Sequence, residues 1–307
     1  MNESLRYHSF SRYLRNRFGC RVHKITLHAG MSCPNRDGTV GRGGCIFCNN
    51  SGFSPNTRVE PSSIRSQMMA GMESARRRVR ASKFIAYFQA YSNTHAPVEQ
   101  LAQMYDAAWV SPDVVGMSVG TRPDCIDPAK VELLSHYTDR GDVWVEYGLQ
   151  TSHDVTLERI NRCHNYDAFL KAVEMTTGRG IHICAHTILG LPGETREMML
   201  ETHRRLAVLP VDGIKIHLLH VMRDTVMEQQ YQRGEIELLS RQQYVELVCD
   251  VLEILPPAMV IQRMHADAPA DVLVAPDWCL DKSGVLNDIR KELDRRDTHQ
   301  GRRMPTV

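Results

Sequence analysis

The chain has 307 residues, of which 42% are hydrophobic and 24% are charged, and its formal net charge is +1. This length is typical of a single α/β barrel with additions, and the composition excludes a disordered chain. The near-zero net charge favours no class of partner, and nine scattered cysteines exclude the disulfide framework of a small secreted protein.

The N-terminal segment carries no pattern typical of export. Residues 1–19 lack the apolar core of roughly 7–15 residues that a signal peptide requires. No run of about 18 apolar residues follows, so we expect no membrane-spanning helix. The expected compartment is therefore the reducing cytoplasm.

Strand-like and helix-like segments then alternate along the chain. β-Branched and aromatic residues followed by turn signals predict strands at 23–29, 84–90, 114–120, 143–150, 181–190 and 213–221. Apolar residues at three- and four-residue spacing predict helices at 61–80, 97–108, 128–139, 165–178 and 195–208. Asp127 before Pro128 is typical of a helix start. This order predicts an α/β fold, a partial (β/α)6 TIM-like barrel with an N-terminal helix over residues 1–222. A helical C-terminal extension, residues 223–307, is expected to pack on it.

Three cysteines lie close together just after the first predicted strand. Cys33, Cys45 and Cys48 have the spacing Cys-x11-Cys-x2-Cys within a glycine-rich segment. Three thiolates can hold three corners of a cubane iron–sulfur cluster and leave one iron open for a substrate or cofactor. Zinc with a fourth ligand, or a redox-active dithiol, is also compatible with these residues. The spacing alone leaves all three interpretations open.

Polar residues gather on the later predicted strands. Glu146 and Gln150 share one face of the fourth strand, and Lys215 and His217 share one face of the sixth. Lys215 and His217 are candidates for substrate contact or proton transfer. His220 lies three residues after His217, so we expect it on the opposite face of the same strand. Buried strands of a parallel barrel are usually apolar, and these polar residues therefore predict a polar ligand inside the barrel.

These residues resemble the radical S-adenosylmethionine (SAM) enzymes. The three-cysteine loop has an aromatic residue, Phe47, just before its last cysteine, as in that family. "VEYGLQTSHDVTLERINRCHN" and "TILGLPGET" resemble the branch of the Elongator catalytic subunit and oxygen-independent coproporphyrinogen oxidase. "YFQAYSNTHAP", "GTRPDCI" and "QRMHADAPADVLVAPDW" extend the resemblance to the YhcC/YtqA group over nearly the full length. The resemblance implies a barrel of the radical SAM type and favours a cluster over zinc.

The resemblance also implies roles for individual residues. Cys33, Cys45 and Cys48 correspond to the ligands of a 4Fe–4S cluster, whose open iron chelates the amino and carboxylate groups of SAM. The residues implied in cofactor binding are Phe47, Ala90, Tyr91, Glu146, Gln150, Arg162, His186 and Val221. Ala90 and Tyr91 stand where relatives have a glycine-rich turn. Arg162 suits the methionine carboxylate by charge and geometry.

The same resemblance implies a reaction and partners. An external electron donor, flavodoxin or ferredoxin, reduces the cluster, and SAM is cleaved to a 5′-deoxyadenosyl radical that abstracts hydrogen from the substrate. The remaining cysteines contain no second CxxC pair, so one cluster is expected. The resemblance to wobble-uridine modifiers, with arginine clusters at 12–21, 76–80 and 295–303, favours tRNA as substrate. The alternatives are a small metabolite as substrate, or a cluster-bearing redox sensor without turnover.

Overall fold

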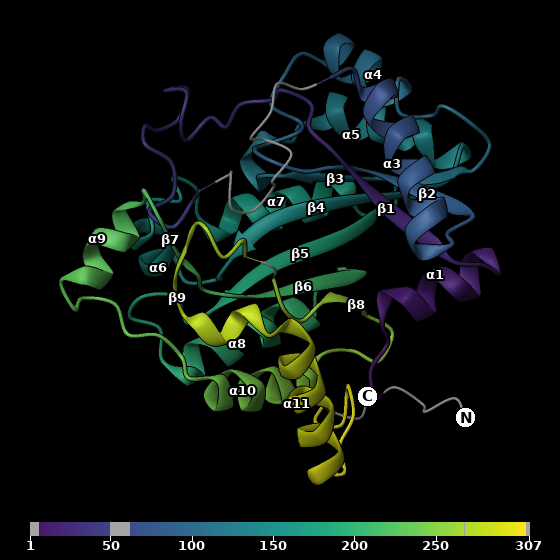
Figure 1. Ribbon diagram of the computed structural model, residues 1–307. Coiled ribbons are helices and arrows are strands. Elements are labelled where there is room, and N and C mark those ends of the chain that lie inside the picture. The colour runs from purple at the N-terminus through teal and green to yellow at the C-terminus, as the bar shows by residue number, and fades with distance from the viewer. Residues whose placement is uncertain (1–5, 50–61, 267, 305–307) are drawn as a thin grey trace.

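The computed structural model describes residues 6–49, 62–266 and 268–304. In this part of the chain, seven parallel strands form a curled sheet in the order β1-β2-β3-β4-β5-β6-β8 (Figure 1). The strands are β1 Val22–Leu27, β2 Lys83–Phe88, β3 Val114–Thr121, β4 Asp142–Gln150, β5 His182–Leu189, β6 Gly213–Leu218 and β8 Val260–Arg263. A separate antiparallel pair joins β7, Val221–Met222, to β9, Leu273–Ala275. The sheet is a half-barrel of the expected type.

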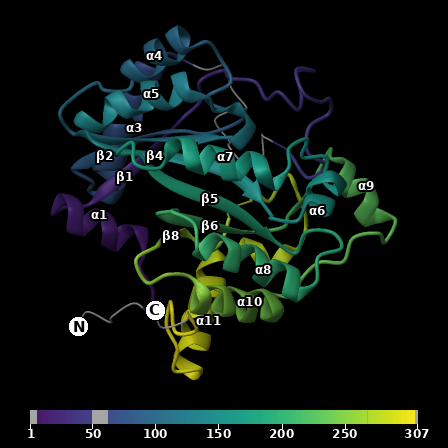
Figure 2. The same ribbon diagram turned by 180° about the vertical axis from the view of Figure 1, so that it is seen from behind.

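Helices surround the sheet, and most of those between successive strands cover its outer face (Figures 1 and 2). They are α1 Phe10–Phe18, α3 Ile64–Val79, α4 Val98–Asp106, α5 Pro128–His136, α6 Asp154–Arg159, α7 Tyr166–Thr176, α8 Arg196–Ala207, α9 Val226–Gln232, α10 Arg241–Ile254 and α11 Lys282–Arg295, with short 3-10 turns η2 Pro123–Cys125, η3 Tyr137–Asp139 and η4 Asp277–Leu280. Both views place α1 at one end of the strands and α6 and α9 at the other, where Figure 1 also shows β7 and β9. No helix in the described part of the chain is long and apolar enough to cross a membrane.

The predicted elements are present, with three differences. The predicted strand 213–221 is divided, because β6 ends at Leu218 and β7 begins at Val221. Strand β8 was not predicted, because its four residues are too few to show a period. Residue 61, where one predicted helix begins, lies outside the described residues. Asp127 caps α5 as predicted, because its side chain accepts a hydrogen bond from the Lys130 amide.

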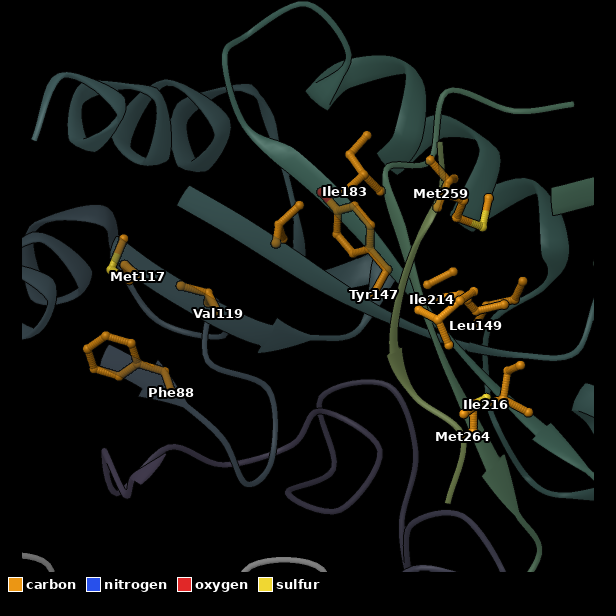
Figure 3. Packing of buried hydrophobic residues seen from close by; sticks show 14 of the residues in the cluster. Phe88, Met117, Val119, Tyr147, Leu149, Ile183, Ile214, Ile216, Met259 and Met264 are labelled. Carbon is orange, nitrogen blue, oxygen red and sulfur yellow. The ribbon is translucent and has the colours of Figure 1, made fainter. Parts of the chain in front are cut away.

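Strand β4 shows how the sequence sorts side chains between the two faces of the sheet. Its alternate residues Val143, Val145, Tyr147 and Leu149 belong to the large hydrophobic core between the sheet and the helices. Figure 3 shows Tyr147 and Leu149 among core residues of neighbouring strands, and the Tyr147 hydroxyl lies 2.7 Å from Thr176 of α7. The intervening residues, from Trp144 to Gln150, therefore face the interior of the half-barrel.

The amino-terminal end of the half-barrel is closed by aromatic residues. Trp144 is fully buried and packs edge-on against Phe10 and Tyr13 of α1. A Cβ atom on Gly213 would lie 2.9 Å from the Trp144 ring, so only glycine leaves room for the indole. The pocket lies at the opposite end, where the carboxyl ends of the strands meet.

Segment 223–307, predicted as a helical extension, contributes to the sheet as well as to the helical layer. Strand β8 pairs with β6, and α10 packs against α8 and α11. The division of the chain at residue 222 stays a prediction.

A charged cluster lies next to the aromatic residues that close the amino-terminal end of the half-barrel. The Tyr13 hydroxyl donates to Asp142 at 2.6 Å, and the Trp144 ring stacks on His182. The His182 imidazole lies 3.8 Å from the Asp142 carboxylate and 3.6 Å from that of Asp212. These carboxylates, Asp142 first, raise the pKa of His182 to about 9.

We predict that this cluster makes stability pH-dependent. The folded pKa of His182 exceeds the unfolded value of about 6.5, so its contribution is complete below pH 6.5 and is lost as pH rises through 9. The free energy of unfolding in urea should fall between pH 6.5 and pH 9.5 by about 1 kcal/mol more in wild type than in His182→Gln, after allowance for solvent screening. Parallel pH profiles for the two proteins would contradict this.

Candidate cluster and cofactor site

One pocket opens at the carboxyl ends of the strands and gathers most of the predicted residues. Its lining includes Cys33, Cys45, Phe47, Cys48, Ala90, Tyr91, Glu146, Gln150, Arg162, His186 and His217. These residues come from the loop after β1 and from strands or loops along the whole sheet. Lys215 lies beneath the pocket, and Val221 is fully buried on β7.

The loop after β1 is folded tightly around the three cysteines. The Cys33 carbonyl accepts a hydrogen bond from Arg36, and the Cys45 carbonyl accepts one from Cys48. Asn35 is fully buried and donates to the Asn161 carbonyl at 2.6 Å, while the Asn161 side chain donates to Gly44 at 2.8 Å. The cysteine loop is thereby attached to the segment after α6.

Two buried arginines border the thiols. Arg162 donates to the Cys45 sulfur at 3.5 Å and to the Gly148 carbonyl at 2.6 Å, and Arg122 pairs with Asp124. Within the described residues, Arg162 Nε and Arg122 Nη1 remain buried without a hydrogen-bond partner. Unpaired buried donors are costly, and anionic thiolates and a carboxylate are suitable acceptors. Three thiols beside two such arginines fit a 4Fe–4S cluster with SAM next to it.

Burial disfavours the ionised form of the Cys48 thiol. Burial, together with the neighbouring Cys45 and Cys33, raises the pKa of the Cys48 thiol to about 12. Metal ligation requires the thiolate, and the positive charge of iron offsets this cost. Cys48 is therefore better suited to ligate a metal than to act as a freely reactive thiol.

A buried carboxylate organises the interior beneath the pocket. Glu146 forms an ion pair with Lys215 and accepts hydrogen bonds from Lys24 at 2.8 Å and His186 at 3.0 Å. Burial opposes its ionisation, but the charges of Lys215 and Lys24 hold the pKa of Glu146 well below its ordinary value. Tyr87 completes the network by accepting from Lys215 at 2.9 Å. These interior polar residues thus largely pair with one another. The sequence pattern had predicted a polar ligand as their partner.

Backbone strain is concentrated around the pocket. Ala90 and Tyr91 have φ values of 79° and 60°, and Gln150 has 77°, all in the left-handed region that favours glycine. Ala90 and Tyr91 occupy the turn where the resemblance implies glycines. The turn therefore keeps the glycine-like backbone without glycine. Strain of this kind persists where the surrounding structure enforces it, commonly at functional sites.

One glycine is required by the position of Arg162. A Cβ atom on Gly148 would lie 2.7 Å from Arg162 Nη2 and 2.9 Å from Gln150 Nε2. The absent side chain lets the guanidinium reach the β4 backbone beside Cys45. The pattern Glu-x-Gly-x-Gln on β4 thus combines a buried charge, a space for Arg162 and a polar residue at the rim.

Three residues at or after the sixth strand lie elsewhere than the sequence predicted. His220 was expected opposite His217, but both line the pocket, because β6 ends at Leu218 and the alternation does not continue. Lys215 is held by Glu146 below the pocket lining. Val221 belongs to β7 and packs in a cluster with Phe47 and Ile188 instead of lining the pocket.

Sequence reasoning missed three residues of the site. Arg122 and Tyr87 lie within the motifs "GTRPDCI" and "YFQAYSNTHAP", but no spacing rule assigns them a role. Arg263 lines the pocket from β8, and it lies in the motif "QRMHADAPADVLVAPDW". Only the pairing of β8 with β6 brings it to the pocket.

Comparison with known proteins decides the family. The model for the radical SAM superfamily matches residues 37–206, and the model for the radical SAM C-terminal domain matches residues 211–295. The chain belongs to the radical SAM superfamily.

Its relatives extend from close to distant. This radical SAM chain is similar to the uncharacterized protein YtqA of Bacillus subtilis, with 43% identity over 98% of this chain and 94% of YtqA. Protein YhcC of Escherichia coli K12 is 41% identical over 92% of this chain and 89% of YhcC. A tRNA uridine(34) acetyltransferase of Dehalococcoides mccartyi is 28% identical over 59% of this chain and 39% of that protein. The structure of Elp3 from Methanocaldococcus infernus shares the fold, with a TM-score of 0.69 and 17% identity over 92% of this chain and 64% of that one.

Membership confirms the expected class and cofactors. Radical SAM proteins are enzymes that use a 4Fe–4S cluster and SAM. Membership of the family therefore favours an iron–sulfur cluster over zinc or a redox-active dithiol in the cysteine loop.

We predict that Ala90→Gly stabilises this radical SAM enzyme. A left-handed backbone destabilises the folded state by about 1–2 kcal/mol at an L-residue, and glycine removes this strain. Glycine also makes the unfolded chain more flexible, which offsets part of the effect, so the net stabilisation is roughly 0.5–1 kcal/mol. The matched control is Ala70→Gly on the exposed face of α3, which should destabilise by about 1 kcal/mol. Urea denaturation of both variants measures the difference, and destabilisation by Ala90→Gly would contradict the strain.

Proposed function

We propose that this radical SAM enzyme abstracts hydrogen to modify a tRNA base, with the wobble uridine as its target. The observation that carries the proposal is a pocket with three cysteines on a half-barrel, surrounded by exposed arginines. The similarity to a tRNA uridine(34) acetyltransferase supports the choice of substrate.

In this proposal, the residues of the pocket divide the work. Cys33, Cys45 and Cys48 would hold the cluster, and Arg162 would bind the methionine carboxylate through its Nε group, which has no partner among the described residues. Once bound and reduced by an external flavodoxin or ferredoxin, the cluster and SAM supply a 5′-deoxyadenosyl radical that removes hydrogen from the substrate. The wall of the half-barrel limits the access of water and of competing hydrogen donors to the pocket.

The remaining predicted residues position the cofactor and substrate. Ala90 and Tyr91 present the strained turn toward the methionine amino group, and Phe47 packs against Ile188 on the adenine side, with Val221 behind them. Gln150 and His186 border the ribose side. Burial and the Lys215 charge lower the pKa of His186 to about 4, so at neutral pH it acts as a neutral hydrogen-bonding group.

Lys215 and His217 have different roles, because Lys215 is buried in the Glu146 network and His217 lines the pocket. Lys215 positions Glu146 and Tyr87 through the buried network. His217 lines the pocket and is the closer candidate for substrate contact.

In this proposal the arginines that contact RNA are those around the pocket, because the cluster at 295–303 is largely ion-paired. Arg295, Arg296 and Arg303 pair with glutamates or an aspartate on α10 and α11. Four exposed arginines near the carboxyl end of the sheet, on loops or at the end of α6, form no ion pair within the described residues; they are Arg36, Arg42, Arg159 and Arg223. We call these four the rim arginines. Unpaired arginines around a pocket suit a phosphate backbone that leads a base inward.

We predict that the protein cleaves SAM only with its cluster. After anaerobic reconstitution and reduction with dithionite, wild type should form 5′-deoxyadenosine, detected by mass spectrometry, and Cys45→Ala should form none. Cys20→Ala, which changes a cysteine remote from the pocket, should keep the cluster spectrum and full product. A normal cluster without any product would favour the redox sensor.

We predict that the rim arginines bind tRNA. The pair Arg42→Glu and Arg223→Glu should weaken tRNA binding at least about tenfold and lower the salt slope by about 2. The control pair, Arg77→Glu and Arg295→Glu, makes the same charge change at arginines that already pair with glutamates, and should have a smaller effect.

The outcomes separate the two candidate substrates. Filter binding over a salt series measures the slope, and nucleoside analysis of tRNA from a deletion strain identifies the modified base. Salt-independent or absent binding by wild type would favour the small metabolite.

A further inference from the structure

The pocket carries more positive than negative charge. Among the described residues that line it, Glu146 is the one carboxylate, against four arginines: Arg36, Arg122, Arg162 and Arg263. Glu146 is already shared by Lys24, Lys215 and His186. The thiolates of a bound cluster would offset part of this positive charge, but only near the arginines that lie beside them.

Three of the four arginines have partners. Arg122 pairs with Asp124, Arg162 donates to Cys45 and the Gly148 carbonyl, and Arg36 donates to the Cys48 carbonyl at 3.5 Å. Arg263 is the last residue of β8 and is half-buried, and it makes no hydrogen bond or ion pair with any described residue. A partly dehydrated guanidinium without an acceptor is unfavourable until an anion binds.

Strand register places Arg263 in a row of basic side chains. His186 pairs with Lys215 across β5 and β6, and Lys215 pairs with Arg263 across β6 and β8. Residues in register on parallel strands share a face, so all three project toward the interior. Because Glu146 already pairs with Lys215, its charge is not available to Arg263.

His217 supplies a second polar group beside this row. It lines the same pocket, and its ring centroid lies 5.3 Å from that of His186. Its Nε2 atom is buried and has no partner among the described residues. An imidazole N–H and a guanidinium together can hold two oxygens of one anion.

We propose that Arg263 and His217 form a subsite for an oxyanion of the substrate, a carboxylate or a phosphate. This rests on the proposed function insofar as the same pocket holds SAM and its target. The subsite is distinct from the methionine carboxylate at Arg162, which lies beside Cys45 on another element. For a tRNA substrate, the oxyanion is a phosphate next to the target nucleotide, and for a metabolite it is the substrate's own acidic group.

The test measures anion binding directly. Holoprotein with saturating SAM is titrated with inorganic phosphate and, separately, with acetate by calorimetry at constant ionic strength. Arg263→Gln should weaken binding of the preferred probe at least about tenfold, and Arg263→Lys should retain part of it, because it keeps the charge but not the fork. SAM affinity should stay within about twofold in both variants, whereas Arg162→Gln should lower it at least about tenfold.

Each result decides the proposal. Equal probe binding by wild type and Arg263→Gln, or no binding of either probe to wild type, overturns it. A loss of SAM affinity in Arg263→Gln as large as in Arg162→Gln assigns Arg263 to the cofactor and overturns it as well. SAM cleavage is scored separately, so a protein that binds the probe without cleaving SAM refutes the proposed function and leaves the subsite standing. The preferred probe tells which oxyanion the site takes.

Discussion

The structure depends on one buried carboxylate. Glu146 lies in the middle of the half-barrel and is neutralised by Lys24 from β1 and Lys215 from β6, with His186 from β5 alongside. Lys24 also donates to Gln262 of β8 at 2.9 Å, so it joins the first and last strands of an open sheet. A buried carboxylate without partners is unfavourable by several kcal/mol, so the polar interior is stable only when the sheet curls.

The interior is layered from that carboxylate outward. Below it, Trp144 and the aromatic residues of α1 close the floor. Above it, Gly148 leaves space for Arg162, and Gln150 reaches the rim in a left-handed conformation. One strand thus sets the depth of the pocket, and the cysteine loop, attached through Asn35, covers its mouth. Chemistry at the carboxyl ends of parallel strands therefore has a rigid, dry support.

Charge is distributed unevenly around this support. Arginines near the thiols have acceptors within the protein, whereas Arg263 on β8 has none among the described residues. Arg295 and Arg296 at the end of α11 are ion-paired, whereas the rim arginines form no ion pair within the described residues. Net charge of the chain is near zero, so these local differences, rather than the total, select an anionic partner.

The family was predictable from the resemblance of several motifs to known proteins, and the first six strands were predictable from local patterns such as the period of two in "VWVEYGLQ". Only the tertiary structure decided that Lys215 pairs with Glu146, that His220 shares the pocket with His217, and that β8 delivers Arg263. Those outcomes depend on contacts between residues far apart in sequence, and on where a strand ends, and neither leaves a periodic signal.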